Sequence, residues 1–135
     1  MKQALMSLLF VTLTAVCVAK ADDSAFSDSP VSCSTPDSVI VKTPKVNFDG
    51  SCTYDVPMLY VSGKRTFVYF SSEASYPSEQ GFCAILGKQF VEAGGSIDII
   101  LRGGTVQVVK LSPQGKLDEL ITNGLASFII HITCR

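Results

Sequence analysis

The sequence predicts a small α+β domain: an antiparallel β-sheet with one helix packed on a face and two disulfides. Three observations lead to this fold class. Short runs of β-branched and aromatic residues recur along most of the chain, separated by Gly, Pro, Asn and Asp turn signals. Only residues 78–93 carry apolar side chains at helical spacing. Four cysteines follow a segment typical of an export signal.

Residues 1–21 have the composition of a signal peptide. Lys2 precedes an almost uninterrupted apolar run, and Ala19-Lys20-Ala21 forms a small-x-small cleavage site. We therefore expect an exported protein, secreted or periplasmic, without a membrane span, because the apolar run is too short for one. Residues 22–36 are rich in Ser, Asp and Pro, which predicts a mobile lead-in. Residues 37–135 then form a single disulfide-stapled domain.

The charge balance argues against one class of partner. Once Lys2 and Lys20 are removed with the signal peptide, nine basic side chains face twelve acidic ones, a net charge of −3. Proteins that bind phosphate backbones gather Lys and Arg on one face, whereas this chain has only the Lys64-Arg65 doublet. We therefore expect no nucleic-acid partner.

The first half of the domain predicts short strands and one hairpin. Residues 39–48 hold two short β-prone runs, 39–41 and 46–48, that Asp49-Gly50 closes. Residues 52–61 and 66–71 form a predicted hairpin around a turn at 62–65. Pro57 places the first of these strands at a sheet edge or a bulge, because proline cannot donate to a ladder.

The predicted helix spans residues 78–93. Ser78 is the expected N-cap, and Glu79 suits the positive end of the helix dipole. Gly81 and Gly87 each weaken the helix by about 1 kcal/mol relative to Ala, so it should depend on packing to persist. The apolar residues at helical spacing and the glycines that end the pattern are Phe82, Ile85, Leu86, Phe90, Ala93 and Gly94-Gly95.

The second half returns to strands. Residues 96–102 and 105–111, around Gly103-Gly104, are the strongest hairpin signal in the chain. Residues 116–121 fit either period, and we favour a strand, while residues 126–134 alternate as a strand to the end of the chain. In the predicted hairpin, one side carries residues expected in the core: Ile97, Ile99, Leu101, Val106 and Val108.

The cysteines predict two structural disulfides. Cys17 lies in the signal peptide, and a lipid anchor there is disfavoured because bulky Val16 precedes it. The remaining four allow three pairings, which sequence alone does not decide: Cys33, Cys52, Cys83 and Cys134. Cys83 on the apolar helix stripe and Cys134 on the apolar face of the last strand favour one bond, which leaves Cys33 with Cys52. No CxxC occurs, so we expect no redox site, metal or cofactor.

No catalytic motif is present. The patterns GxSxG, GxGxxG and HExxH are absent, and His131 is the only histidine. A lone histidine on the less apolar face of a strand is usually a boundary residue. Asp118 and Glu119 are sequence neighbours, so in a strand they point to opposite faces and do not make an acid–base pair. A hydrolase using His131 or distant carboxylates is therefore the least favoured function.

Aromatic and basic residues of the predicted 52–71 hairpin form the best candidate for a binding surface: Tyr54, Tyr60, Lys64, Arg65, Phe67 and Tyr69. Both faces of residues 66–71 are apolar, and we expect the second face to be covered rather than exposed. The favoured function is an exported, non-catalytic module that contacts a protein or a cell-envelope component. The alternative is a secreted inhibitor or effector of a partner enzyme that uses a rigid 62–65 loop. The sequence leaves the oligomeric state open.

Overall fold

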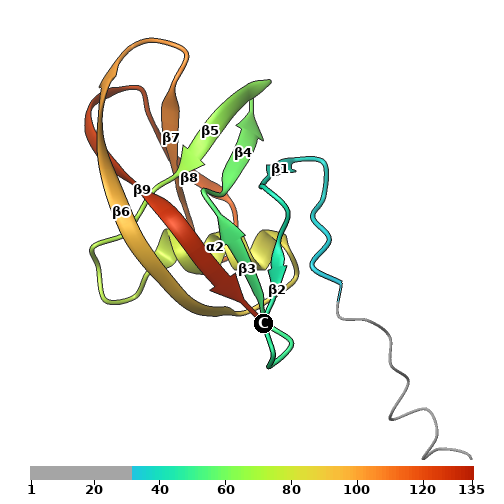
Figure 1. Cartoon of the computed structure of the whole chain (residues 1–135). Coiled ribbons are helices and arrows are strands. Elements are labelled where there is room, and N and C mark those ends of the chain that lie inside the picture. Colours follow the sequence, from blue (N-terminus) through green and yellow to red (C-terminus); the bar gives the residue numbers. More distant parts are fainter. Residues whose placement is uncertain (1–31) are drawn as a thin grey trace, which may run out of the picture. The chain divides into compact units, whose positions relative to one another are not determined.

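The computed structural model describes residues 32–135, which form two β-sheets and one helix (Figure 1). The predicted signal peptide, residues 1–21, and residues 22–31 of the predicted lead-in lie outside the described residues. The combination of β-sheet, one helix and two disulfides agrees with the predicted fold class in outline. Among the described residues, no helix has the length and apolar character needed to cross a bilayer.

The elements follow one another along the chain in this order: β1 (Val39–Ile40), β2 (Lys45–Val46), β3 (Cys52–Asp55), β4 (Met58–Val61), β5 (Lys64–Val68), α2 (Pro77–Ile85), β6 (Phe90–Arg102), β7 (Gln107–Leu111), β8 (Leu117–Ile121) and β9 (Asn123–Cys134). The prediction of a strand over residues 116–121 is confirmed by β8.

The strands form two sheets where the sequence predicted one. The first sheet has the order β1-β4-β5-β7-β8, and the second has the order β2-β3-β9-β6. All neighbouring strands are antiparallel except β5 and β7, which are parallel. The expectation of a purely antiparallel sheet is therefore wrong for the first sheet. A bridge between Tyr69 and Phe128 connects the two sheets beyond the end of β5.

The predicted hairpin over residues 52–71 is confirmed only in its second part. Met58 to Val61 pair with Lys64 to Phe67 across a two-residue turn, so Lys64 and Arg65 lie in β5 and not in a loop. β3 instead pairs with β9 in the other sheet. The chain changes sheets at Val56 and Pro57, where Val56 has a positive φ of 42°. The sequence signal at Pro57 marks this change of sheet.

The predicted hairpin over residues 96–111 is wrong. β6 pairs along its length with β9, whereas β7 pairs with β5 and β8. The loop after Arg102 therefore crosses from one sheet to the other. Leu101 and Val108 are buried as expected, but Ile97 is 50% exposed and Val106 is exposed. β9 has twelve residues and β7 has five, so pairing with β9 gives β6 more inter-strand hydrogen bonds than pairing with β7 would. β9 is distant from β6 in the sequence, and a local turn motif cannot predict such a pairing.

The helix is shorter than predicted because Gly87 ends it. α2 stops at Ile85, Gly87 has a φ of 68°, and the N–H of Lys88 donates to the carbonyl of Cys83. Together with the bond from Gly87 N–H to Ala84 O, this is a Schellman C-cap. Phe90 and Ala93 therefore belong to β6.

The start of the helix also differs from the prediction. Tyr76 is the N-cap, and Ser78 lies within the first turn, where its hydroxyl accepts a bond from the N–H of Leu111 at 3.1 Å. Glu79 is buried, and its Oε1 accepts the N–H of Ser71 at 2.7 Å. Its Oε2 has no hydrogen-bond partner within residues 32–135, and burial raises the pKa of this carboxyl. Glu79 thus ties the helix to the segment after β5.

The two disulfides have the expected pairing. Cys33 bonds to Cys52 at 1.97 Å, and Cys83 bonds to Cys134 at 1.95 Å. Cys52 and Cys134 face each other across β3 and β9, so both bonds meet at one place in the core. Such bonds form and persist in oxidising compartments, typically outside the cytosol.

Buried side chains form two clusters. The disulfide core comprises Cys33, Val39, Cys52, Tyr54, Leu59, Val68, Phe82, Cys83, Val109, Leu111, Ile129, Ile132 and Cys134. The small core comprises Leu101, Val108 and Ala126, with Phe67, Tyr69, Ile99 and Ile121 packed around them. Val68 and Val109 belong to the disulfide core, while Val108 belongs to the small core and Phe67 packs against it. Both faces of β5 and β7 are therefore covered, as the sequence analysis expected for residues 66–71.

Candidate binding surface

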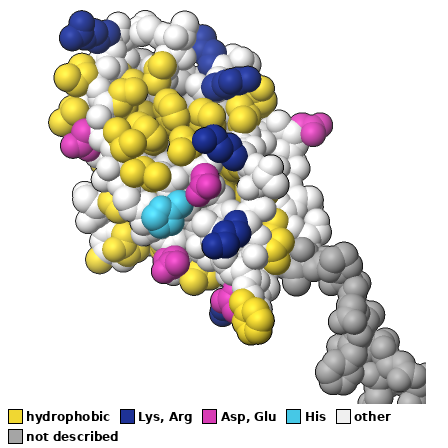
Figure 2. Space-filling model, viewed as in Figure 1, with side chains coloured by type: hydrophobic (Ala, Val, Ile, Leu, Met, Phe, Trp, Pro, Cys, Tyr) yellow, Lys and Arg dark blue, Asp and Glu magenta, His cyan; other side chains and the backbone are white. Residues whose placement is uncertain are grey.

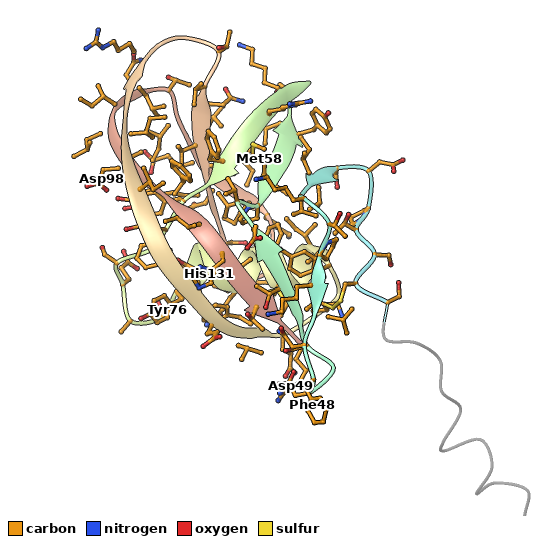
Figure 3. The ribbon with its side chains drawn as sticks, in the orientation of Figure 1. Phe48, Asp49, Met58, Tyr76, Asp98 and His131 are labelled. Carbon is orange, nitrogen blue, oxygen red and sulfur yellow. A yellow bond between two sulfur atoms is a disulfide. The ribbon has the colours of Figure 1, made fainter. Side chains whose placement is uncertain are left out.

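The loop between β2 and β3 presents a phenylalanine to solvent. Phe48 is fully exposed, and Val46 at the end of β2 is 52% exposed. Figure 3 shows Phe48 at the tip of the loop, beside Asp49 and pointing away from the domain. Exposing a whole aromatic ring to water forgoes the free energy that its burial would release, about 2 kcal/mol or more. A folded domain that leaves such a ring unpacked has a surface suited to a partner.

Hydrogen bonds hold this loop in one conformation. The N–H of Asn47 donates to the carbonyl of Ser51 at 2.8 Å. The side-chain amide of Asn47 donates to Thr53 Oγ1 at 2.8 Å and to Ser51 Oγ at 3.0 Å. Asp49 Oδ1 accepts both the N–H and the hydroxyl of Ser51. The Cys33–Cys52 disulfide lies immediately after the loop and anchors it to the disulfide core.

Asp49 also pairs with the last residue of the chain. Its second carboxylate oxygen accepts a bond from the guanidinium of Arg135. The hydroxyl and N–H of Ser51, followed by Arg135, lower the pKa of Asp49 to about 2. Asp49 is therefore ionised at any pH above that value. The carboxylate next to Phe48 is largely neutralised by its own chain, so the tip of the loop offers mainly an apolar contact.

A groove runs from this loop across the outer face of β3, β9 and the start of β6. It encloses about 580 Å³ and is lined by Lys45, Asn47, Phe48, Asp49, Ser51, Thr53, Val91, Glu92, His131 and Thr133. The hydroxyls of Thr53 and Thr133 lie 2.9 Å apart and continue the hydrogen-bond chain from Asn47 across two strands. A row of hydrogen-bonded polar side chains therefore crosses the floor of the groove, with Phe48 at one end (Figure 3).

His131 lies in this groove, on the less apolar face of β9 as expected. It faces Asp55 on β3 and Gly94 on β6. A Cβ atom added at Gly94 would lie 2.1 Å from Nε2 of His131, so the imidazole occupies the space above that glycine. This close approach gives Gly94 a structural role that the sequence analysis did not assign. Within residues 32–135, no three His, Cys, Asp or Glu side chains gather as a metal site.

The six residues of the predicted binding surface are separated. Tyr54 is wrong as a surface residue, because it is fully buried with its ring 5.8 Å from that of Phe82. Phe67 is half-buried and stacks on Phe128, with ring centroids 4.3 Å apart. Tyr69 is half-buried, and Lys110 Nζ lies 4.8 Å from the centre of its ring. These three aromatic residues mainly stabilise the fold.

Tyr60, Lys64 and Arg65 remain exposed. Tyr60 faces Arg65 across β4 and β5, and Met58 faces Phe67 on the same side of the hairpin. A second groove of about 540 Å³ is lined by Met58, Lys64, Arg65, Phe67, Thr105 and Val106. Figure 2 shows hydrophobic side chains gathered above the histidine on this side of the molecule, with Lys and Arg side chains around them. Lys64, Arg65 and Phe67 thus border an apolar patch with basic side chains around it.

Phe48 is the residue that sequence reasoning missed. Residues 46–48 were assigned to a strand, but β2 ends at Val46 and Phe48 belongs to the turn. The signal was present, because Asn47, Asp49 and Gly50 are turn formers on both sides of the aromatic residue.

Comparison of the chain with protein-family models, with curated proteins and with solved structures found no match.

Proposed function

We propose that this protein is an exported, non-catalytic binding module that docks on a partner protein through the Phe48 loop. The observation that carries the proposal is a fully exposed phenylalanine on a loop held by hydrogen bonds and next to a disulfide. A rigid aromatic side chain loses little conformational freedom on binding, so most of the free energy of its burial remains available for affinity. Aromatic residues of this kind are frequent hot spots.

The chemistry of the loop defines the partner site. Phe48 requires an apolar pocket, and the polar floor behind it, with Thr53, Thr133 and His131, suits the hydrogen-bonding rim of such a contact. The alternative function is inhibition of a partner enzyme, for which the sequence suggested a rigid loop over residues 62–65. Because Lys64 and Arg65 lie in β5, that loop is only a two-residue turn, and we assign the inhibitory contact to the Phe48 loop instead. Inhibition would result if the partner's apolar pocket that receives Phe48 belongs to an enzyme active site.

Site-specific photocrosslinking tests the proposal. The intact protein, carrying benzoylphenylalanine in place of Phe48, should crosslink to a defined partner in the extracellular or envelope fraction of the producing cells. The matched control carries the same group in place of Leu117, which is 55% exposed on β8. With the purified partner, Phe48→Ala should weaken binding about 30-fold or more, as loss of a hot spot does. Leu117→Ala should bind like the wild type.

Equal crosslinking at both positions, or full affinity of Phe48→Ala, would refute the Phe48 loop as the docking site. If the partner is an enzyme, titration of its activity with wild type and Phe48→Ala distinguishes inhibition from simple docking. Inhibition requires loss of activity at one equivalent of the wild type, with recovery in the variant.

A further inference from the structure

The strand β6 has a free edge. Within residues 32–135 it pairs along one side only, with β9, and it is the outermost strand of its sheet (Figure 1). Figure 3 labels Asp98 on this strand. The unpaired N–H and C=O groups of an edge strand can add a further strand by the same hydrogen bonds that build the sheet.

The ladder between β6 and β9 keeps one register from Glu92 to Arg102, and its shift lies between Phe90 and Glu92. Gly95 has a φ of 66°, and Gly103, just after the strand, has a φ of 67°. From Ser96 to Arg102, each residue faces one residue of β9 and none has a positive φ. These seven residues therefore present a regular edge that is ready to pair.

One face of this segment is unusually apolar for a solvent-exposed strand. Asp98, Ile100 and Arg102 share the face and are all exposed. Ile100 is 66% exposed, and its cross-strand neighbour Leu125 on β9 is 68% exposed. Two large aliphatic side chains thus lie together in water, with an acid on one side and a base on the other. The hydroxyl of Ser127 donates to Asp98 and orients its carboxylate on this face.

We propose that a second copy of this chain pairs with this edge, antiparallel, about a two-fold axis through Ile100. In that register, Asp98 faces Arg102 of the second copy and Arg102 faces its Asp98. Ile100 faces Ile100, and Ile99 faces Leu101 on the inner side. Two opposite-charge pairs then flank an aliphatic centre, and Leu125 of each copy extends it. An isologous contact of this kind uses one self-complementary segment twice.

Other registers are less favourable. Facing residues of antiparallel strands point to the same side, so the axis must pass through a residue. An axis at Asp98 opposes two carboxylates, which is destabilising. An axis at Ile99 places Asp98 against Ile100, and one at Leu101 places Arg102 against Ile100. An axis at Ile97 pairs Glu92 with Arg102 only beyond Gly95, where the backbone has a φ of 66°. Within Ser96 to Arg102, only the axis at Ile100 opposes unlike charges.

The pairing would join the two β2-β3-β9-β6 sheets into one continuous sheet. β2 is at the opposite edge from β6, so the two Phe48 loops would lie at the two outer ends of that sheet. If the proposed function is correct, the dimer presents two docking loops and gains avidity toward a partner with repeated sites. The dimer itself does not depend on that function.

Sedimentation velocity on the intact, oxidised protein over a range of concentrations tests the pairing. The wild type should sediment as a dimer at high concentration. Arg102→Asp and Asp98→Arg should each weaken dimerisation about 30-fold, because two like-charged pairs replace two opposite ones. The double variant Asp98→Arg with Arg102→Asp restores opposite pairs and should restore the dimer. A monomeric wild type, or single variants that dimerise as well as the wild type, would overturn the proposal.

A crosslink tests the register separately. Across the proposed axis, the Cα atoms of the two Ile100 residues would lie about 4.5–5.5 Å apart, within disulfide range. Ile100→Cys should therefore form a disulfide-linked dimer under mild oxidation. Leu125→Cys is the matched control, since it is equally exposed but one strand further from the axis on each side. Equal crosslinking of both variants would refute the register. Mass spectrometry of a non-reduced digest confirms that the two native disulfides remain intact.

Discussion

The strand β9 takes part in both cores, and its two ends differ in how they are stabilised. At the C-terminal end, Ile132 and Cys134 lie in the disulfide core, between β3 and β6, with two disulfides and the helix nearby. At the other end, Ala126 belongs to the small core, and Leu125 is exposed. The crosslinked end can therefore hold a rigid loop with an unpacked aromatic residue. The other end keeps an unpaired edge, whose charged and aliphatic residues fit a second copy.

Loss of a disulfide should give the largest effect on stability. Replacing Cys83 and Cys134 by Ala should lower the free energy of unfolding by about 4 kcal/mol, because their bond closes the longer loop, with a sequence separation of 51 residues. Replacing Cys33 and Cys52 should cost about 3 kcal/mol, for a separation of 19 residues. Denaturation in guanidinium measures both. A reversed order would show that native contacts, and not loop length, decide the effect.

Truncation in the small core should cost less. Leu101→Ala removes a side chain that is 4% exposed, and we expect a loss of about 2–3 kcal/mol. Its neighbour Ile100 points to solvent, so Ile100→Ala should change stability by no more than about 0.5 kcal/mol. Both should be measured in the Arg102→Asp background, so that dissociation of a dimer does not contribute. Equal losses for the two variants would mean that the outer face of β6 is packed in the monomer.

The two perturbed carboxyls should give opposite dependences of stability on pH. Burial raises the pKa of Glu79, so its contribution is fully present below the usual Glu pKa of about 4.3 and is lost as pH rises through the raised value. Asp49, whose pKa is lowered to about 2, contributes fully above the ordinary Asp pKa of 3.8 and loses that contribution as pH falls toward 2. Urea titrations from pH 2 to pH 8 measure both.

Two isosteric variants separate these contributions. Glu79→Gln should reduce the loss of stability above the usual Glu range. Asp49→Asn should be less stable than the wild type near neutral pH and equal to it near pH 2. The Asp49 effect should be small and sensitive to salt, because that side chain is exposed. A Glu79→Gln variant with the pH profile of the wild type would contradict the assignment.

Phe48→Ala should have the smallest effect. The ring is fully exposed, so its removal should change the free energy of unfolding by less than about 0.5 kcal/mol. Thermal unfolding beside the wild type measures this change. A loss above about 1 kcal/mol would show that the ring packs on the domain in solution, which would also remove the basis of the proposed docking site.

Local patterns predicted elements well and partners poorly. The strand predicted over residues 126–134, the presence of a helix near residue 80 and the less apolar face that carries His131 follow from alternation and helical spacing. The end of the helix did not, because Gly87 was counted as a weak helix residue and not as a C-cap. The hairpin over residues 96–111 failed for a different reason. Gly103-Gly104 is a local turn signal, whereas β6 forms more inter-strand hydrogen bonds by pairing with β9, which lies much further along the chain.

The candidate site illustrates the same division. Aromatic residues near Lys64 and Arg65 suggested a surface, but Tyr54 and Phe67 differ from Tyr60 only in what packs against them. Such contacts come from Phe82 and Phe128, on other elements. Phe48 was overlooked because Val46 and Phe48 alternate as in a short strand, although Asn47, Asp49 and Gly50 around them favour a turn. Its exposure became clear only once the side chains around it were known.

For residues 32–135, the sequence by itself determined the β-rich character, the presence of a helix and the parity of the strand residues, because these depend on spacing within a few residues. The apolar faces on which Cys83 and Cys134 were expected to lie also indicated the disulfide pairing that the structure contains. Only the tertiary structure decided how the strands divide between two sheets, which aromatic residues are buried and which edge is free. These properties arise from competition among distant segments for the same hydrogen bonds and apolar surface, and no local pattern records the outcome of that competition.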